Sequence, residues 1–215
     1  METLLLARHA LAGSNRDGNA SCAIPGEGLT PEGVEQARDL GGLLAGERID
    51  LGVATELRRT QETLELALRG RRVPTIVIPE LDEIDFGSFD GGPLDLYRSW
   101  AASESPSLSA PGGGESRAAV AARFARGLRL VLERPEAVVL AIGHALAIRY
   151  LLDAAHGLPP AARMAPVEHA RTYRLGALDA VAAASLLEEW SRAPRFRDPS
   201  IGGWAQSEAR RPSRG

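Results

Sequence analysis

The sequence predicts an α/β sandwich with a mostly parallel central sheet, and two observations support that fold class. Short aliphatic runs alternate along the chain with longer segments of helical periodicity, as in strand–helix–strand units with right-handed crossovers. Two of these runs, residues 3–7 and 138–142, end in the pairs Arg8-His9 and Gly143-His144. Because the carboxyl ends of parallel strands meet at one edge of a sheet, where open α/β sheets bind ligands, we expect both histidines at that edge.

Local signals place the individual elements in chain order. Strands are expected where short apolar runs lie between turn-forming residues, at residues 3–7, 51–54, 75–78, 138–142 and, at an edge, 172–175. Helices are expected where apolar residues recur at helical spacing, at residues 31–45, 57–68, 94–102, 117–131, 145–155 and 180–190. Thr30 and Ser116 are suitable N-caps, and Pro31 fits the first position of a helix.

Three stretches lack periodicity and are expected to be loops. Residues 13–19, rich in Gly and Asn, are expected to form a non-helical loop that covers the site. Residues 81–92 suit a structured loop, and residues 103–114, rich in Ser, Pro and Gly, suit a flexible connection. Residues 1–190 are therefore expected to form a single domain, followed by a flexible tail at residues 191–215.

Composition limits the possible function classes. The chain has 215 residues, of which 44% are hydrophobic and 25% charged, as in ordinary globular proteins. A net charge of −3, without a basic block before the C-terminal tail, argues against a nucleic-acid partner, and no apolar run reaches the ~18 residues that span a membrane. The single Cys22 and a start without a basic leader favour a cytoplasmic protein. The oligomeric state stays open, with a homodimer as one alternative.

The Arg8-His9 pair has the residue types that phosphoryl transfer needs. A neutral imidazole is a nucleophile, and a guanidinium presents a planar fork of donors that matches a phosphate. His9 and His144 can also be read as metal ligands. That reading is weaker, because neither lies in a close His-x-His or His-Glu-x-x-His spacing and the neighbouring arginines repel a cation. We therefore expect no metal and no cofactor.

Six segments, in this order, resemble the histidine phosphatase superfamily, which includes cofactor-dependent phosphoglycerate mutases and many small phosphomonoesterases. They are Arg8-His9 after a strand, Leu29-Thr30-x-x-Gly33-x-x-Gln36-Ala37, Leu57-x-Arg59-x-x-x-Thr63, Glu83 ahead of Phe86-Gly87 and Gly91, Gly114-Glu115-Ser116, and Gly143-His144. The resemblance covers about residues 3–175 and rests on the ordered combination. It implies a three-layer α/β/α sandwich and a first histidine that is phosphorylated during turnover.

The resemblance also implies roles for individual residues. His9 would be the nucleophile, Glu83 the proton donor, and Arg8, Arg59 and His144 the phosphate pocket. A further residue, Asn15, matches a position that often touches the phosphate in this family.

The chain departs from the family pattern at three positions. The family usually has Gly after its first histidine and a hydroxyl residue two positions further on, where this chain has Ala10 and Ala12. Ala145 follows the second histidine in place of the more usual Gly. The change at Ala12 removes a candidate phosphate donor.

The chemistry asks for these residue types independently of the family. Phosphoryl transfer spreads negative charge over three oxygens, which Arg8, Arg59 and a protonated His144 can stabilise. His9 must be neutral at its attacking nitrogen, and we expect a backbone carbonyl to bind the other nitrogen.

The leaving alkoxide needs a proton, which Glu83 can supply if burial keeps it protonated. Asp82 and Asp85 lie close by in the sequence, so the identity of the donor stays open.

The function that fits best is a phosphomonoesterase that hydrolyses small phosphorylated metabolites through a phosphohistidine. A phosphoglycerate-mutase-type phosphotransferase is the near alternative, although residues 103–114 are short for the segment that recognises phosphoglycerate in such enzymes. A non-catalytic phosphate-binding domain is the other alternative, against which the intact set of arginines and histidines argues. His156 and His169 are read as structural.

A set of four arginines is read as a solvated basic face of the helix after Ser116, with substrate steering as the alternative. They are Arg117, Arg123, Arg126 and Arg129.

Overall fold

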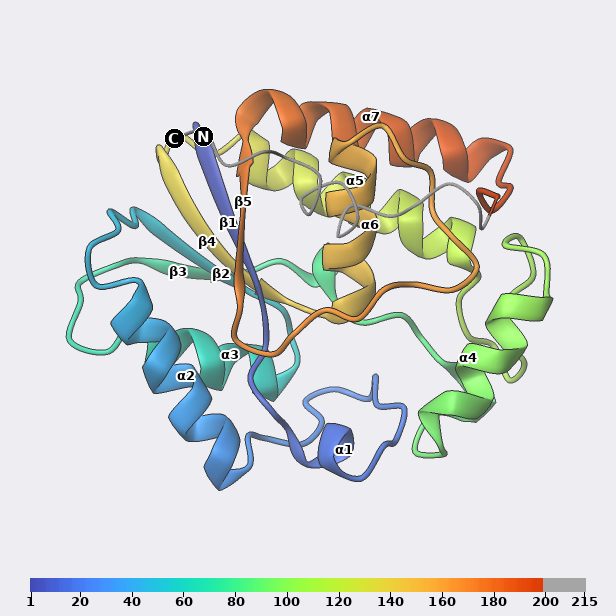
Figure 1. Cartoon of the computed structure of the whole chain (residues 1–215), viewed down its shortest axis with the longest axis horizontal. Helices are drawn as coiled ribbons and strands as arrows, with labels where there is room; N and C mark the ends of the chain where they lie inside the picture. The colour runs from blue at the N-terminus through green and yellow to red at the C-terminus, as the bar shows by residue number, and fades with distance from the viewer. Residues whose placement is uncertain (199–215) are drawn as a thin grey trace, which may run out of the picture.

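A five-stranded sheet with the strand order β3-β2-β4-β1-β5 forms the centre of the computed structural model, which describes residues 1–198 (Figure 1). The strands are β1 (Thr3–Arg8), β2 (Leu51–Ala54), β3 (Thr75–Val77), β4 (Val138–Gly143) and β5 (Thr172–Gly176). The first four are mutually parallel, whereas β5 pairs with β1 in the antiparallel sense at one edge. The predicted α/β class with a mostly parallel sheet is confirmed.

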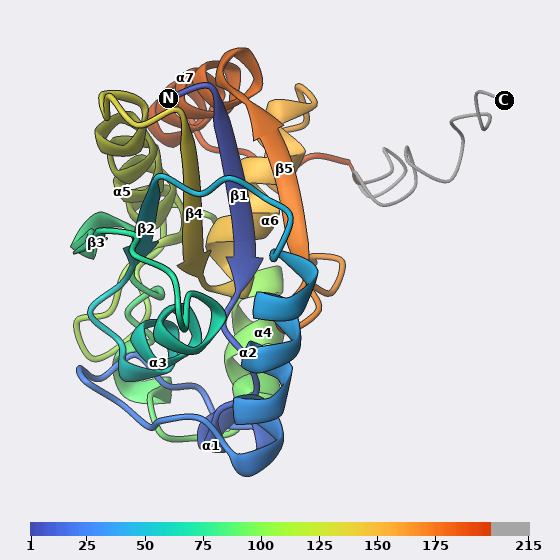
Figure 2. The same cartoon turned by 90° about the vertical axis from the view of Figure 1, so that its left-hand side faces the viewer.

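Helices cover both faces of the sheet, which confirms the three-layer sandwich (Figures 1 and 2). The longer helices are α2 (Pro31–Leu43), α3 (Arg58–Ala67), α4 (Leu94–Ser103), α5 (Arg117–Leu132), α6 (Ala145–Ala155) and α7 (Ala177–Arg192). Two short 3-10 turns, η1 (Pro79–Leu81) and η2 (Gly87–Phe89), precede α4. In Figure 2, α2 and α3 lie in front of the sheet and α5, α6 and α7 behind it, while α4 lies beyond the carboxyl ends of β1 and β4.

The sequence of β1 explains why both faces are covered. Its residues alternate between two apolar cores, with Leu4 and Leu6 packing among the α5–α7 side chains and Leu5 and Ala7 among those of α2 and α3. A strand that is buried on both faces reads as a continuous apolar run, and this is what residues 4–7 show.

The register of β1 and β4 brings the two histidines together. Arg8 lies opposite Gly143, and the amide of His9 donates to the Gly143 carbonyl oxygen at 3.0 Å. His9 and His144 therefore leave the sheet side by side, with their ring centroids 5.3 Å apart.

The start of α2 holds the segment that follows His9. Thr30 caps the helix by accepting from the Gly33 amide at 3.0 Å, and its own amide donates to the Leu11 carbonyl at 3.0 Å. A Cβ at Gly33 would lie 2.1 Å from that carbonyl oxygen, so only glycine allows this contact. Gln36 adds a second anchor, because its Oε1 accepts from the Leu11 amide at 3.0 Å.

Two expectations for the backbone were wrong. Residues 13–19 are not entirely loop, because Gly13–Arg16 form the one-turn helix α1, closed by a bond from the Arg16 amide to the Ala12 carbonyl at 3.1 Å. The C-terminal tail begins later than expected, since α7 runs to Arg192 and Phe196 stacks on Trp190 with ring centroids 6.0 Å apart. The rest of the expected tail, residues 199–215, lies outside the described residues.

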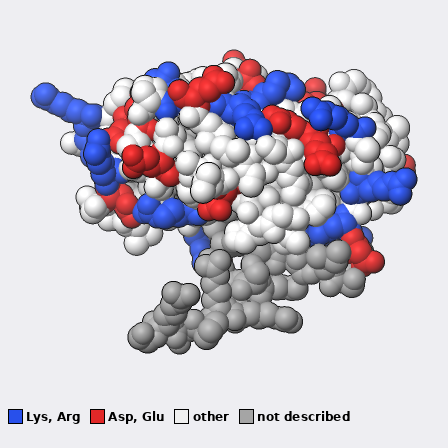
Figure 3. All heavy atoms as spheres, turned by 90° about the horizontal axis from the view of Figure 1, so that it is seen from above, with Lys and Arg blue, Asp and Glu red and all other residues white. Residues whose placement is uncertain are grey.

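The outer surface carries charges of both signs. Figure 3, which views the molecule from above Figure 1, shows acidic and basic side chains interspersed around an uncharged area. None of the helices within residues 1–198 is both long and apolar enough to cross a membrane.

Candidate active site

His9 lies directly after β1 and is buried, with 2% of its surface exposed. Its Nδ1 lies 2.8 Å from the carbonyl oxygen of Ala10. Since a carbonyl only accepts, Nδ1 carries the proton and Nε2 presents a lone pair. This is the backbone contact that the sequence analysis expected. Burial and the charges of Arg59 and Arg8 hold the pKa of His9 well below its ordinary value, so the ring is neutral.

Arg59, in the first turn of α3, contacts both histidines. Its Nε donates to Nε2 of His9 at 3.2 Å, and its Nη2 lies 3.3 Å from Nδ1 of His144 and 2.9 Å from the carbonyl oxygen of Ser21. Its Nη1 is buried and has no hydrogen-bond partner among residues 1–198. Thr63, one turn along α3, accepts from the Ala10 amide at 3.0 Å and so ties the helix to the nucleophile segment.

Arg8 supplies the second guanidinium. Its Nη1 donates to the Val167 carbonyl at 2.8 Å, while its buried Nε has no partner. Burial lowers the pKa of Arg8 to about 10, which leaves it charged at neutral pH. Two buried arginine donors without acceptors, next to a neutral histidine, are suited to bind an oxyanion.

His144 is fixed from behind by a buried chain of hydroxyls. Its Nε2 lies 3.0 Å from Oγ1 of Thr55, which lies 2.9 Å from Oγ1 of Thr60, which donates to the Leu57 carbonyl at 2.8 Å. Because Arg59 can only donate to Nδ1, the proton of His144 lies on Nε2. Burial and the charge of Arg59 hold its pKa well below the ordinary value, so His144 is neutral and not the cation that the sequence analysis considered.

The N-terminus of α6 faces the same space, since Ala145 and Leu146 line the pocket. The first amides of a helix have no acceptor within the helix, and the helix dipole favours an anion there. His144 is the N-cap residue of α6, and Ala145 occupies its first helical position.

Glu83 is the acidic side chain that lines the pocket. Its Oε1 accepts from the Ile84 amide at 3.1 Å, and its Oε2 lies 3.9 Å from Nδ1 of His144. Burial raises its pKa against the opposing charges of Arg59 and Arg8, which favours the protonated acid.

The two neighbouring acids face elsewhere. Asp82 accepts from the Glu56 amide at 2.8 Å and Asp85 from the Gly87 amide at 2.8 Å. Both line a second cavity, which Glu83 also reaches, and neither lines the pocket of Arg8 and Arg59. Burial raises the pKa of Asp82 to about 6, but its carboxylate does not reach the pocket of Arg8 and Arg59.

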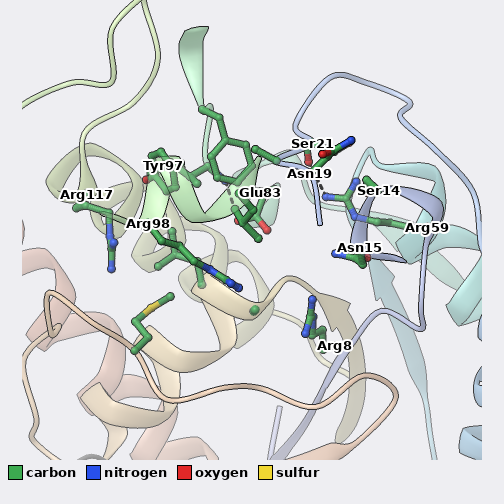
Figure 4. A pocket seen from close by; sticks show the side chains of 17 residues that line it. Arg8, Ser14, Asn15, Asn19, Ser21, Arg59, Glu83, Tyr97, Arg98 and Arg117 are labelled. Atoms are coloured by element: carbon green, nitrogen blue, oxygen red, sulfur yellow. Dashed lines mark hydrogen bonds between the residues drawn. The ribbon is translucent and has the colours of Figure 1, made fainter. Parts of the chain in front are cut away.

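The pocket encloses about 610 Å³ of empty space, including solvent at its mouth (Figure 4). Its polar lining combines residues that the sequence pointed to with others that it did not. The expected residues are Arg8, Asn15, Arg59 and Glu83, and the further polar ones are Ser14, Asn19, Ser21, Tyr97, Arg98 and Arg117. Apolar residues form the rest, namely Ala20, Ile84, Phe86, Leu94, Ala145, Leu146 and Met164. His9 and His144 lie behind Arg59 and do not line the pocket surface.

The residues missed by sequence reasoning had little local signal. Ser14 lines the pocket, and its place next to the expected residue Asn15 was a signal that could have identified it. Ala12 is fully buried and does not line the pocket. Tyr97 and Met164 lie in segments with ordinary helical or loop composition, so no pattern marked them. His169 was read as structural, and its Nδ1 donates to the carbonyl oxygen of His9 at 2.8 Å.

The face of α5 was also misread, because Arg117 is buried and Arg123 is mostly buried rather than solvated. Among the residues that the structure describes, no group of three or more His, Cys, Asp and Glu side chains is arranged to hold a metal ion.

The site consists of a buried histidine and two arginines at the carboxyl edge of a three-layer α/β/α sandwich, and this set of residues suits an oxyanion such as a phosphoryl group. The sequence profile of the histidine phosphatase superfamily (branch 1) matches residues 4–206, and the chain belongs to this family.

Named relatives are bacterial phosphatases. The chain is 42% identical over 87 residues to the adenosylcobalamin/alpha-ribazole phosphatase of Escherichia coli (strain K12), which is 40% of this chain and 42% of that protein. The Salmonella typhimurium protein of the same name is 38% identical over 87 residues, covering 40% of this chain and 43% of that protein. The matched segment thus spans less than half of these relatives. The crystal structure of the alpha-ribazole phosphatase from Shigella flexneri superposes with a TM-score of 0.69 and 30% identity, covering 80% of this chain and 89% of that chain.

Proposed function

We propose that the protein is a phosphomonoesterase that hydrolyses small phosphorylated metabolites through a phosphohistidine on His9. The observation that carries this proposal is a neutral, buried His9 whose Nε2 lone pair accepts from Arg59 and lies within the field of Arg8. Each of these arginines has a buried donor that lacks an acceptor within residues 1–198. Membership in the histidine phosphatase superfamily and the phosphatase names of the relatives support it. No step of the proposed reaction needs a metal or a cofactor.

The phosphate of the substrate binds between Arg8, Arg59 and the first turn of α6. Nε of Arg8 and Nη1 of Arg59 supply the donors, and Asn15 lies in the pocket wall within the same one-turn helix, α1, as Ser14. Two guanidinium charges and a helix N-terminus match the charge that spreads over the equatorial oxygens during transfer.

His9 then attacks phosphorus through Nε2. Since Nε of Arg59 donates to this atom, Arg59 must transfer that hydrogen bond to a phosphate oxygen before the attack. The bond from Nε2 to phosphorus forms while the bond from phosphorus to the ester oxygen breaks. The Ala10 carbonyl stabilises the proton on Nδ1 as positive charge develops on the ring.

Glu83 gives its proton to the departing alkoxide and becomes a carboxylate. In the second step this carboxylate takes a proton from water as the water oxygen attacks the phosphohistidine, which releases inorganic phosphate and restores neutral His9. His144, neutral and fixed by Thr55, holds Arg59 through Nδ1.

A labelling experiment tests the nucleophile. Protein mixed with a ³²P-labelled phosphate ester and quenched in base should retain label that is stable in base and lost in acid, as expected for phosphohistidine. His9→Ala should retain none, whereas His156→Ala, at the C-terminus of α6, should label normally. Label found on a serine, or normal turnover by His9→Ala, would overturn the mechanism. Phosphate release without a bisphosphate primer separates the phosphatase from a mutase.

We place this enzyme in the cytoplasm, acting as a single catalytic domain on small-molecule phosphate esters. The free thiol of Cys22 fits a reducing compartment, and burial raises its pKa to about 12, which keeps it unreactive.

A further inference from the structure

The pocket has a second polar end that the proposed reaction does not use. In Figure 4, Tyr97 and Arg117 lie at the opposite end of the pocket from Arg59, and the side chain of Arg98 reaches into the space between. Tyr97 and Arg98 come from α4, and Arg117 is the first residue of α5.

Arg117 is a buried cation without a carboxylate partner. It is 6% exposed, and its guanidinium donates to the Tyr150 hydroxyl at 2.6 Å and to the Ala161 carbonyl at 3.4 Å. It also lies over the rings of Tyr150 and Phe196. Among residues 1–198 no Asp or Glu pairs with it, although a buried charge normally requires an opposite one.

Tyr97 adds a buried hydroxyl without a partner. The residue is 4% exposed, and within residues 1–198 its oxygen has no partner at hydrogen-bonding distance and geometry, although the guanidinium of Arg117 lies close enough to interact with it. Its ring packs edge-on against Phe86 at 4.7 Å between centroids. Burial raises the pKa of Tyr97, and the nearby charge of Arg117 acts against that rise. An unsatisfied hydroxyl beside an uncompensated guanidinium is costly unless a ligand binds there.

The surroundings reinforce the positive charge. Arg98 and Arg117, together with Arg8 and Arg163, also line a cavity that adjoins the pocket. Arg98 pairs with Asp95 at 3.0 Å, so its charge is partly balanced, whereas Arg117 has no such partner within residues 1–198. Among residues 1–198, no acidic residue lines that adjoining cavity. Glu83, the acid of the main pocket, lies beside His144, although its charge also acts on Tyr97. Electrostatics at this end therefore favour an anion.

We propose that the guanidinium of Arg117 and the hydroxyl of Tyr97, with Arg98 at the rim, form a second oxyanion subsite. The substrates would then be phosphate monoesters with a second anionic group, a carboxylate or another phosphate, joined through an apolar body that contacts Leu146 and Met164. This inference rests on the proposed phosphatase function and names the substrate class of the same pocket.

A series of paired esters tests the subsite. Each pair consists of the phosphate monoester of an ω-hydroxy carboxylic acid, from two to five carbons, and its neutral primary amide of equal length. A parallel series of alkanediol bisphosphates distinguishes a phosphate from a carboxylate as the second group. At one chain length, the kcat/KM of the anionic member should exceed that of the amide by about 10-fold or more, as charge-assisted hydrogen bonds would give.

Two variants test whether Tyr97 and Arg117 cause that preference. Tyr97→Phe removes only the unpartnered hydroxyl, so it should reduce the ratio of anionic to amide kcat/KM without lowering the melting temperature. Arg117→Lys keeps the charge and should retain part of the ratio, whereas Arg117→Gln should bring it close to one. Arg126→Gln, an exposed arginine on the same helix, is the matched control and should leave the ratio unchanged.

The outcomes separate this inference from the proposed function. If every ester of the series is hydrolysed with equal kcat/KM for the anionic and amide members, the subsite is wrong and the phosphatase stands. If Tyr97→Phe lowers the melting temperature and leaves the ratio unchanged, the hydroxyl is structural and the subsite is again wrong. If no ester is hydrolysed, the phosphatase proposal itself fails, and the subsite with it.

Discussion

Arg59 connects the parts of the pocket at the scale of single residues, because one guanidinium contacts His9, His144 and the Ser21 carbonyl. Its planar fork reaches three acceptors in different directions, which a lysine ammonium could not do with the same geometry. Its positive charge also helps to keep both imidazoles neutral. The sequence identified Arg59, His9 and His144, but the contact with Ser21, the tautomer of His144 and its Thr55 partner could not be inferred without coordinates.

Glu83 can be tested through the leaving group. A general acid matters in proportion to the basicity of the departing oxygen, and such assistance is worth ~10²–10⁴-fold. Glu83→Gln should therefore lose about 10²-fold or more in kcat with an alkyl phosphate and far less with a nitrophenyl phosphate, whose leaving group departs as an anion. Steady-state kinetics with both esters measure the difference.

The pH dependence of activity tests the same residue. The first step needs protonated Glu83, whose pKa is raised by burial, so wild-type activity on an alkyl ester should fall as pH rises through that pKa. The low pKa of His9 keeps the nucleophile neutral across this range. Glu83→Gln should lose this alkaline limb. If Asp82→Asn or Asp85→Asn discriminates between the esters instead, the proton donor has been misassigned.

At the scale of elements, α5 holds the loop that carries Glu83. Arg123 pairs with Glu115 and donates to the carbonyl oxygens of Asp82 at 2.9 Å and Glu83 at 3.1 Å. The sequence analysis read this arginine as solvated, because helical spacing shows which face a side chain occupies but not which distant loop packs against that face.

Arg123 is therefore a positioning residue, and its removal should imitate a weaker form of the Glu83 change. We expect Arg123→Gln to lower kcat on alkyl esters about 10-fold with a smaller effect on nitrophenyl esters, and to cost about 2 kcal/mol of unfolding free energy as buried acceptors lose their donor. Arg123→Lys should retain only part of the wild-type kcat and of the wild-type free energy of unfolding, since an ammonium cannot form the same fork of hydrogen bonds.

The dependence of kcat on the leaving group decides whether Arg123 positions Glu83. Urea denaturation measures the stability, and Arg126→Gln serves as the exposed control on α5. If Arg123→Gln slows both esters equally, or only destabilises the fold, then the residue does not position the acid.

The elements themselves were largely predictable, for identifiable physical reasons. The strand β4 is a long aliphatic run buried on both faces, and α2 and α5 begin at the side-chain caps Thr30 and Ser116, both of which form in the structure. The helix α1 was missed because one turn has little intrinsic stability. It is held by its tertiary setting, including the bridge between Ala12 and Leu29.

At the scale of the whole molecule, the site is assembled at the carboxyl edge of the sheet from segments far apart in the chain. The strand ends could be placed because the topology of parallel strands dictates their common edge. The opposite wall could not, since Tyr97, Arg117 and Met164 reach it through the packing of α4, α5 and the loop after α6. The residues proposed to select the substrate could therefore be found only from the fold, whereas those proposed to bind the phosphate could be predicted from the sequence.

The unpartnered arginine donors have a consequence for global stability. Nε of Arg8 and Nη1 of Arg59 are buried without acceptors, so an oxyanion that satisfies them binds the folded state and not the unfolded chain. At a phosphate or vanadate concentration of 100 times Kd, the free energy of unfolding should rise by about 2.7 kcal/mol. For a chain of this size that is a melting temperature higher by roughly 5–10 °C. Thermal unfolding across a titration of each anion measures it.

The same titration separates arginine binding from metal binding. The shift should persist after exhaustive chelation, because the attraction comes from side-chain guanidinium groups. Arg8→Met and Arg59→Met should each reduce it strongly, whereas Arg69→Met, an exposed arginine just beyond α3, should preserve it. A shift that vanishes with chelator and returns with a divalent ion would instead assign His9 and His144 to a metal site. A shift of equal size in Arg59→Met would show that the anion binds elsewhere on the molecule.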